Sequence, residues 1–149
     1  MGKKDKKRMV DKYFLPDTNI LIYALSDRQP YSSWFAKVIK EKKLVLSSLV
    51  VAEFLSGATK EEEISFRLLL ENFDVLPVDS VVAQVAAQYR KKFLQKKKKV
   101  WMFDCLIAAT CKVFGATLAT FDKKDYPMGD IKVISEFSPL KNRQGFTTI

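Results

Sequence analysis

The chain has 149 residues, of which 48% are hydrophobic and 29% charged, a composition typical of one globular domain. It contains no histidine, which excludes Ser-His-Asp and Cys-His catalysis and imidazole metal ligands. Its formal net charge of +9 favours polyanionic partners, nucleic acid ahead of an anionic membrane surface. An enzyme built on this chain must therefore work with carboxylates, hydroxyls, lysines or a bound ion.

The apolar runs, the basic start and the two cysteines of the sequence indicate its cellular compartment. No apolar run is long enough to cross a bilayer, and no signal-peptide core follows the basic start MGKKDKKRM. Cys105 and Cys111 fall within one expected helix without zinc-site spacing, so we expect two reduced core thiols. These features predict a cytoplasmic protein that does not associate with membranes.

Short apolar segments alternate with longer helical patterns along the chain. A basic flexible tail is expected over 1–11. Strands are then expected over 12–16, 44–48, 74–78, 116–120 and 131–135, and helices over 18–26, 32–43, 49–57, 60–73, 79–95 and 102–115. This alternation predicts one α/β domain over 12–149, with three layers (α/β/α) and a mostly parallel sheet of about five strands.

The first strand of this pattern ends at Asp17, in KYFLPDTN. One interpretation is that Asp17 caps the helix that follows, because an Asp oxygen accepts from free backbone N–H groups. The other is that the strand delivers Asp17 to a chemical site, since ligands bind at the carboxyl ends of the strands in open α/β sheets.

Four more acidic residues allow a similar choice. Glu53 falls in SLVVAEFL, a helix that otherwise reads as core, and a lone buried Glu is costly. Asp104 shares a helix face with core residues, although the helix dipole also favours an acid there. Asp122 and Asp125 follow the fourth strand, where Asp is also common in turns.

Taken together, Asp17, Glu53, Asp104 and Asp122 can meet at the carboxyl edge of the sheet. Carboxylates about 4–5 Å apart repel by roughly 3–4 kcal/mol per pair at an effective dielectric constant near 20. Such a cluster either keeps protons or holds a cation, and oxygen ligands alone select Mg²⁺ or Mn²⁺. The chemistry that this ion supports is phosphodiester hydrolysis, which agrees with the basic surface.

Four segments, FLPDTNILIYAL, SSLVVAEFLSG, FDCLIAATC and LATFDKKDYP, resemble in order and spacing the acidic motifs of the PIN-domain ribonucleases. The most similar group is the VapC-like toxins of type II toxin–antitoxin pairs. The resemblance runs from about Tyr13 to Ile134. It implies a PIN-like fold, Mg²⁺- or Mn²⁺-dependent endoribonuclease activity on single-stranded segments of RNA such as tRNA or rRNA loops, a homodimer, and inhibition by a cognate antitoxin.

The resemblance also implies roles for individual residues. Asp17, Glu53, Asp104 and Asp122 would hold the metal and carry catalysis. The supporting residues would be Thr18, Asn19, Ser48, Thr120 and Asp125. Asn19 would fix the turn around Asp17. The last motif leaves open whether Asp122 or Asp125 is the fourth ligand, and we favour Asp122. The bulky segment VWMF before Asp104 departs from the family pattern and affects the fit of the substrate.

The basic stretch KKFLQKKKKVW precedes Asp104. It is either a solvated helix end or a rail for the RNA backbone formed by Lys96, Lys97, Lys98 and Lys99. Trp101 could stack on a base, but we expect it in the core or in a dimer interface, because exposed tryptophans are uncommon. The alternative function is a PIN-like module that binds RNA or protein without cutting. The four acidic positions argue against it.

Overall fold

Twelve elements make up the part of the chain that the computed structural model describes, residues 13–137. The predicted tail over 1–11 and the end of the predicted domain, 138–149, lie outside it. The strands are β1 (Phe14–Pro16), β2 (Leu46–Ser47), β3 (Val75–Leu76), β4 (Thr117–Ala119) and β5 (Val133–Ile134). The helices are α2 (Thr18–Leu25), α3 (Tyr31–Lys40), α4 (Ser48–Gly57), α5 (Lys60–Asn72), α6 (Ser80–Gln95), α7 (Met102–Phe114) and the 3-10 turn η1 (Lys123–Asp125).

All strand pairs are parallel, which confirms the predicted fold class. The order β1-β4-β5 forms one sheet, and β2 pairs with β3 in a second. The two are joined by a single parallel bridge between Phe14 and Leu44, in which Phe14 N–H donates to the Lys43 carbonyl at 2.8 Å. The five strands were expected to form one sheet. They are instead divided three and two, because each is only two or three residues long.

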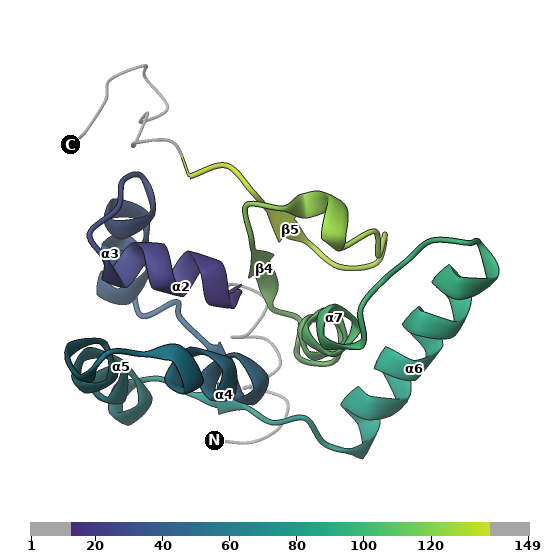
Figure 1. The fold of residues 1–149 in the computed structure, drawn as a ribbon, viewed down its shortest axis with the longest axis horizontal. Helices are drawn as coiled ribbons and strands as arrows, with labels where there is room; N and C mark the ends of the chain where they lie inside the picture. Colours follow the sequence, from purple (N-terminus) through teal and green to yellow (C-terminus); the bar gives the residue numbers. More distant parts are fainter. Residues whose placement is uncertain (1–12, 138–149) are drawn as a thin grey trace.

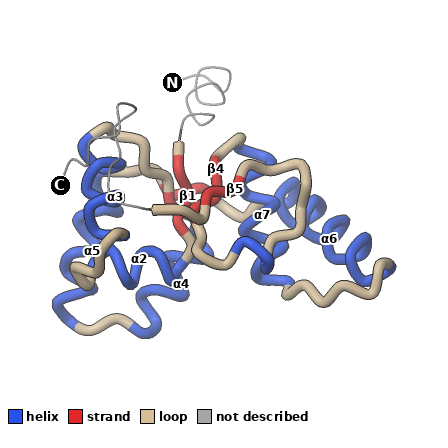
Figure 2. Tube along the Cα trace, turned by 90° about the horizontal axis from the view of Figure 1, so that it is seen from above, coloured by secondary structure: helices blue, strands red, loops and turns tan. Residues whose placement is uncertain are grey.

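Helices cover both faces of the strands. Figure 1 shows α2, α3, α4 and α5 on one side and α6 and α7 on the other, and Figure 2 shows the strands between the two groups. The strand residues Leu15, Leu46 and Leu118 are completely buried, as parallel strands covered on both faces require. The predicted three-layer arrangement is therefore present.

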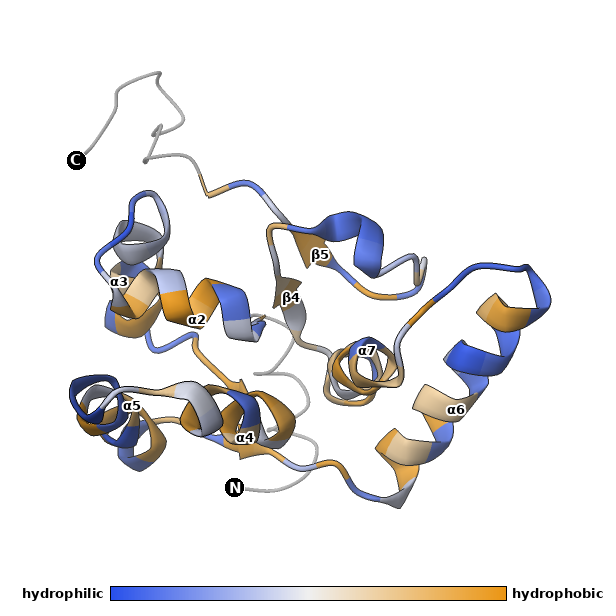
Figure 3. Cartoon of the chain, viewed as in Figure 1, coloured by the Kyte–Doolittle hydropathy of each residue, from blue (hydrophilic) through white to orange (hydrophobic). Residues whose placement is uncertain are grey.

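The helix α7 passes through the interior, as its apolar sequence predicts. Cys105, Ile107 and Cys111 are among its buried residues, and both thiols are free. Figure 3 shows α7 as mostly hydrophobic, whereas the connection that leads to it from α6 is hydrophilic. Gly115 ends α7 with a left-handed φ of 76°, and its N–H donates to the Cys111 carbonyl at 2.8 Å. The helix is thereby fixed in the core with its first turn at the carboxyl edge of the strands.

Candidate active site

The predicted acidic residues gather around one small cavity at the carboxyl edge of the strands. Its volume is about 170 Å³. Its lining residues are Asp17, Thr18, Asn19, Glu53, Phe103, Asp104, Asp122, Asp125 and Tyr126. These come from the end of β1, the start of α2, the middle of α4, the first turn of α7 and the segment after β4. The topology thus joins segments that are up to about a hundred residues apart in the chain.

Asp17 lies where both of the interpretations considered for it require. Its Oδ1 accepts from Ile20 N–H at 3.1 Å and so caps α2. It also lines the cavity, because its own N–H donates to the Ala119 carbonyl at 2.9 Å and holds it beside the end of β4. Burial raises the pKa of Asp17, and Glu53 raises it further, against hydrogen bonds from the Thr120 hydroxyl and the backbone of α2. A nearby cation would favour the ionised form of this half-buried carboxyl group.

Asp104 lies in the first turn of α7 and is also half-buried. Burial raises its pKa to about 6, and the charges of Asp125, Asp17 and Glu53 contribute in the same direction. Its Oδ1 accepts from the Tyr126 hydroxyl at 3.3 Å. The side chains therefore repel one another across the cavity, which is the electrostatic signature that the sequence predicts.

Glu53 lines the cavity, but it is not the buried glutamate that the sequence predicted. The helix α4 buries only Val50 and Phe54, so it is not the near-continuous core helix that the sequence indicated. Glu53 itself is exposed to solvent. The argument from the cost of burying a lone glutamate was therefore wrong, although the residue does line the cavity.

Only some of the predicted supporting residues contact the candidate acids or line the cavity. Thr120 is buried, and its Oγ1 accepts from Asp122 N–H at 3.1 Å. Asn19 is exposed, and the turn that it was expected to fix is held by Asp17. Ser48 begins α4 but does not line the cavity. The neighbouring Ser47, which the sequence analysis passed over, is buried and caps α4 through Leu49 N–H at 3.2 Å.

Tyr126 and Phe103 complete the lining, and neither was predicted as a site residue. Burial raises the pKa of the Tyr126 phenol, and the charge of Asp104 adds to this, so the phenol stays a neutral donor to Asp104. The aromatic residue that follows Asp125 in the last motif was the signal for it. Phe103 belongs to the bulky VWMF segment, so this departure from the family pattern lies directly against the cavity.

The two candidates for the fourth acid differ in their surroundings. Both line the cavity, but Asp125 is the carboxylate with the largest effect on Asp104. Asp122 lies 3.9 Å from the exposed Lys124 ammonium. Burial raises the pKa of Asp125, and the charge of Asp122 raises it further. The two aspartates act as a pair at the rim.

The cavity is suited in chemistry to a divalent cation. Its donors are all oxygens, and the Thr18 Oγ1 atom in its lining is buried without a hydrogen-bond partner among the described residues. Within residues 13–137, however, no three acidic side chains already stand at ligand spacing. The convergence expected from the sequence is thus only partial: the carboxylates share a cavity, and the exposed Glu53 and the rim pair would have to turn inward.

The basic segment before α7 is exposed. Lys96, Lys97, Lys98 and Lys99 all face solvent. Trp101 was expected in the core or in an interface, but its side chain is 60% exposed in the described chain, so the core placement is wrong. The Lys99 ammonium lies 4.6 Å from the centre of the Trp101 ring, in a cation–π contact. This contact leaves the ring exposed and does not pair the lysine with an acid.

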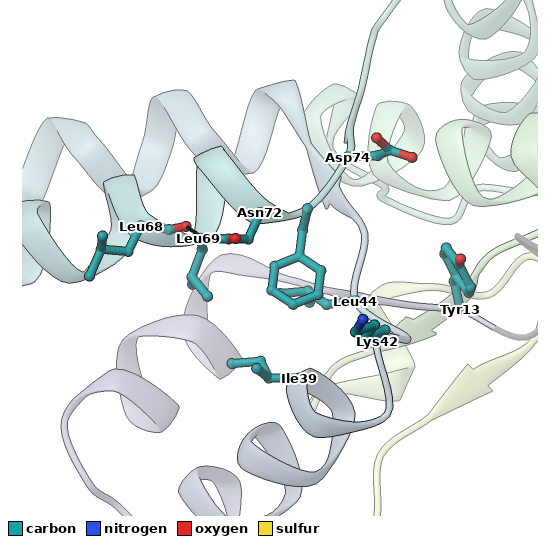
Figure 4. A pocket seen from close by; sticks show the side chains of 9 residues that line it. Tyr13, Ile39, Lys42, Leu44, Leu68, Leu69, Asn72 and Asp74 are labelled. Atoms are coloured by element: carbon teal, nitrogen blue, oxygen red, sulfur yellow. Dashed lines mark hydrogen bonds between the residues drawn. The ribbon is translucent and has the colours of Figure 1, made fainter. Parts of the chain in front are cut away.

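A larger cavity, of about 520 Å³, lies at the opposite edge of the strands (Figure 4). Its lining includes Tyr13, Leu44 and Asp74, which precede or begin strands, and apolar residues of α3 and α5. None of the predicted site residues lines it, and Asp74 is its single carboxylate. The small acidic cavity is therefore the candidate active site despite its size.

Comparison with known proteins agrees with this geometry. The family model of the PIN domain matches residues 14–128, and the chain belongs to the PIN domain family. A curated relative, ribonuclease VapC10 of Mycobacterium tuberculosis, is 29% identical over 114 residues, which are 76% of this chain and 86% of that protein. No described helix is both long and apolar enough to span a membrane.

Solved structures include chains of similar fold. FitAcB from Neisseria gonorrhoeae is 30% identical, with a TM-score of 0.65 over 80% of this chain and 95% of that one. VapBC2 from Rickettsia felis, solved with a DNA fragment from its promoter, has a TM-score of 0.70 at 21% identity, over 82% and 97% of the two chains. FitAcB is thus similar to this chain in sequence and in fold, whereas the similarity to VapBC2 shows the fold alone.

Proposed function

We propose that this protein is a Mg²⁺- or Mn²⁺-dependent endoribonuclease and the toxin of a toxin–antitoxin pair. The observation that carries the proposal is the single cavity lined by Asp17, Glu53, Asp104 and the pair Asp122–Asp125. Supporting it are the family match, the ribonuclease name of the curated relative and the net charge of +9. A protein that only binds RNA has no use for carboxylates that raise one another's pKa.

In this proposal Asp17 and Asp104 are the main metal ligands, because they are half-buried and held by hydrogen bonds. Glu53 and one of the rim pair complete the set, and the effect of Asp125 on Asp104 makes it an equal candidate to Asp122. When bound, the ion supplies an activated water and neutralises charge on the scissile phosphate. Thr120 supports Asp17 through its hydroxyl, and Tyr126 orients Asp104 by donating to it. The buried Thr18 hydroxyl, which has no partner among the described residues, would support the bound ion instead.

The substrate proposed is single-stranded RNA, such as a tRNA or rRNA loop. The exposed lysines 96–99 precede Asp104 by only a few residues and would follow the RNA backbone toward the cavity. Trp101, exposed at the start of α7, is available to stack on a base. We place this activity in the cytoplasm, where such RNA is found.

The partners proposed are an antitoxin and a second copy of the chain. One of the similar structures is named a toxin–antitoxin complex, and another is named a member of a family of toxin–antitoxin systems. A second cavity of about 420 Å³ adjoins the acidic one and shares Thr18, Asn19 and Glu53 with it. A segment of an antitoxin that covered the site could continue into this space. An upstream reading frame for a DNA-binding protein would support the pairing.

The test is cleavage of mixed tRNA and structured RNA by the purified protein, with Mn²⁺ and with EDTA. Asp17→Asn should abolish cutting, since it removes a ligand while Asn still caps a helix. Asp79→Asn is the matched control: Asp79 caps α6 by accepting from Val82 N–H at 3.0 Å, outside the cavity. Equal cutting by Asp17→Asn would contradict the proposal. RNA binding without any cutting by the parent would favour the non-catalytic alternative.

A further inference from the structure

An aromatic stack includes the residue that directly precedes Asp122, a lining residue of the acidic cavity. It consists of Arg28, Tyr23 and Phe121. The Arg28 guanidinium lies 4.2 Å from the centre of the Tyr23 ring, and the Phe121 ring stacks on Tyr23 at 5.2 Å with an interplanar angle of 10°. Tyr31 packs against Phe121 at 5.7 Å and 52°. Phe121 is 37% exposed, so the stack ends in solvent.

The position of Phe121 ties the stack to the cavity. It directly follows Thr120, whose hydroxyl supports Asp17, and directly precedes Asp122. Consecutive Cα atoms are about 3.8 Å apart, so its backbone adjoins that of a lining residue. Tyr23 lies six residues after Asp17 along α2, roughly 9 Å at the helical rise.

We propose that Phe121 stacks on the base of a nucleotide next to the scissile phosphate of single-stranded RNA. The inference rests on the proposed function and adds a specificity-determining residue to it. Every base has a π face, so the subsite requires a base without selecting which one. A duplex, whose bases are already stacked, would not present one.

The charges around the stack favour RNA over a second copy of the chain. The acids near Phe121 are the exposed Asp27 and the cavity residues Asp122 and Asp125, and the proposed ion would offset the charge of the latter two. The cations that a partner would then meet are Arg28, Lys123 and Lys124, all of which are exposed. A two-fold interface would bring these cations against copies of themselves. A phosphate backbone would instead be attracted by them.

The experiment measures kcat/KM for a short single-stranded RNA and for a series in which one nucleotide at a time is abasic. In the parent, we expect one abasic position beside the cut to reduce kcat/KM on the order of 10-fold, mainly through KM. Phe121→Leu should lower kcat/KM for the intact RNA by a similar factor, and the abasic position should then cause no further reduction. Phe121→Trp should restore both the activity on intact RNA and the reduction caused by the abasic position.

Ile64→Ala is the control, because Ile64 is 62% exposed on α5 and lines none of the cavities described here. It should behave like the parent, and melting temperatures would show that each variant folds. An undiminished abasic effect in Phe121→Leu would overturn the inference. So would a loss of self-association in Phe121→Leu, by sedimentation, with the abasic effect intact, because the ring would then belong to an interface between copies.

A binding measurement separates this inference from the proposed function. Asp17→Asn would be titrated into the same RNA carrying 2-aminopurine beside the cut, or at successive positions if the parent does not cut. Stacking on Phe121 should quench the fluorescence, and adding Phe121→Leu should remove the quenching. If the parent fails to cut but this quenching is present, the nuclease proposal fails and the stacking subsite stands. If the quenching is unchanged by Phe121→Leu, the subsite is overturned.

Discussion

Asp104 is the residue whose ionisation is most informative, because its pKa is raised to about 6 from an ordinary value of 3.8. Burial, followed by the charges of Asp125, Asp17 and Glu53, disfavours the charged form and outweighs the hydrogen bond from the Tyr126 hydroxyl, which lowers the pKa. Below about pH 4 the folded and unfolded chains both hold the proton, and the residue costs nothing. Between about pH 4 and 6 the unfolded chain loses the proton first, so stability falls as the pH rises.

Asp104→Asn should therefore stabilise the metal-free protein more at neutral than at acid pH. We expect the difference in unfolding free energy between variant and parent to grow by about 1 kcal/mol from about pH 4 to about pH 7, a value reduced because Asp104 is half-exposed. Urea unfolding in EDTA at a series of pH values measures it. A difference that stays constant across this range would show that the carboxylate is not strained.

A bound cation should remove the same strain. Mg²⁺ or Mn²⁺ should raise the melting temperature of the parent by mass action on the folded state, more strongly above about pH 6, where Asp104 is ionised. Asp104→Asn should lose most of this response. Thermal melts with and without Mn²⁺ measure it, and a variant that responds like the parent would contradict the metal site.

At the scale of elements, the sequence pattern located the five strands and six α-helices of the described residues, because apolar periodicity and turn residues are local signals. It did not predict the 3-10 turn η1. It also located the acids that line the cavity. It misjudged the exposure of Glu53 and Trp101, since exposure depends on which neighbours arrive from distant segments. It passed over Tyr126, whose contact with Asp104 spans 22 residues.

The two glycines at helix ends show the same limit and provide a matched test. The helices expected over 49–57 and 102–115 both end at a glycine. Gly57 is the last residue of α4, without a positive φ, and an added Cβ there would meet nothing within 4 Å. Gly115 has the left-handed φ of 76° that a side chain disfavours. From sequence alone both read as C-caps.

Gly115→Ala should thus lower the free energy of unfolding by about 1 kcal/mol, because Ala is strained in the left-handed region. Gly57→Ala should be neutral or stabilise the protein by up to about 1 kcal/mol, because Ala is the better helix former. Chemical denaturation of both variants measures this. Equal effects of the two substitutions would show that the backbone at Gly115 does not determine the end of α7.

Over the whole molecule, the excess of positive charge is expected to act through one segment. Replacing four lysines by glutamine there should weaken RNA binding and reduce the slope of log K against log salt by up to about 3, at roughly 0.7 per phosphate contact on single strands. The four are Lys96, Lys97, Lys98 and Lys99.

The control removes the same charge elsewhere. The control variant replaces four other exposed lysines, which come from α3, the turn after it and the start of α5: Lys37, Lys40, Lys42 and Lys60. Lys42 has the same left-handed φ of 57° as Lys97, so both variants change one such position. This variant should keep most of the slope. Equal losses in the two variants would show that RNA is held by the net charge and not by the segment before α7.

The carboxylates of the small cavity are the centre of this account, and direct counting of bound Mn²⁺ by electron paramagnetic resonance tests them most directly. The parent should bind Mn²⁺ at neutral pH, and Asp17→Asn should lose most of this binding. Asp79→Asn, which changes an equivalent helix cap outside the cavity, should bind as the parent does. Unchanged binding in Asp17→Asn, or equal loss in both variants, would contradict a metal site at the carboxyl edge of the strands.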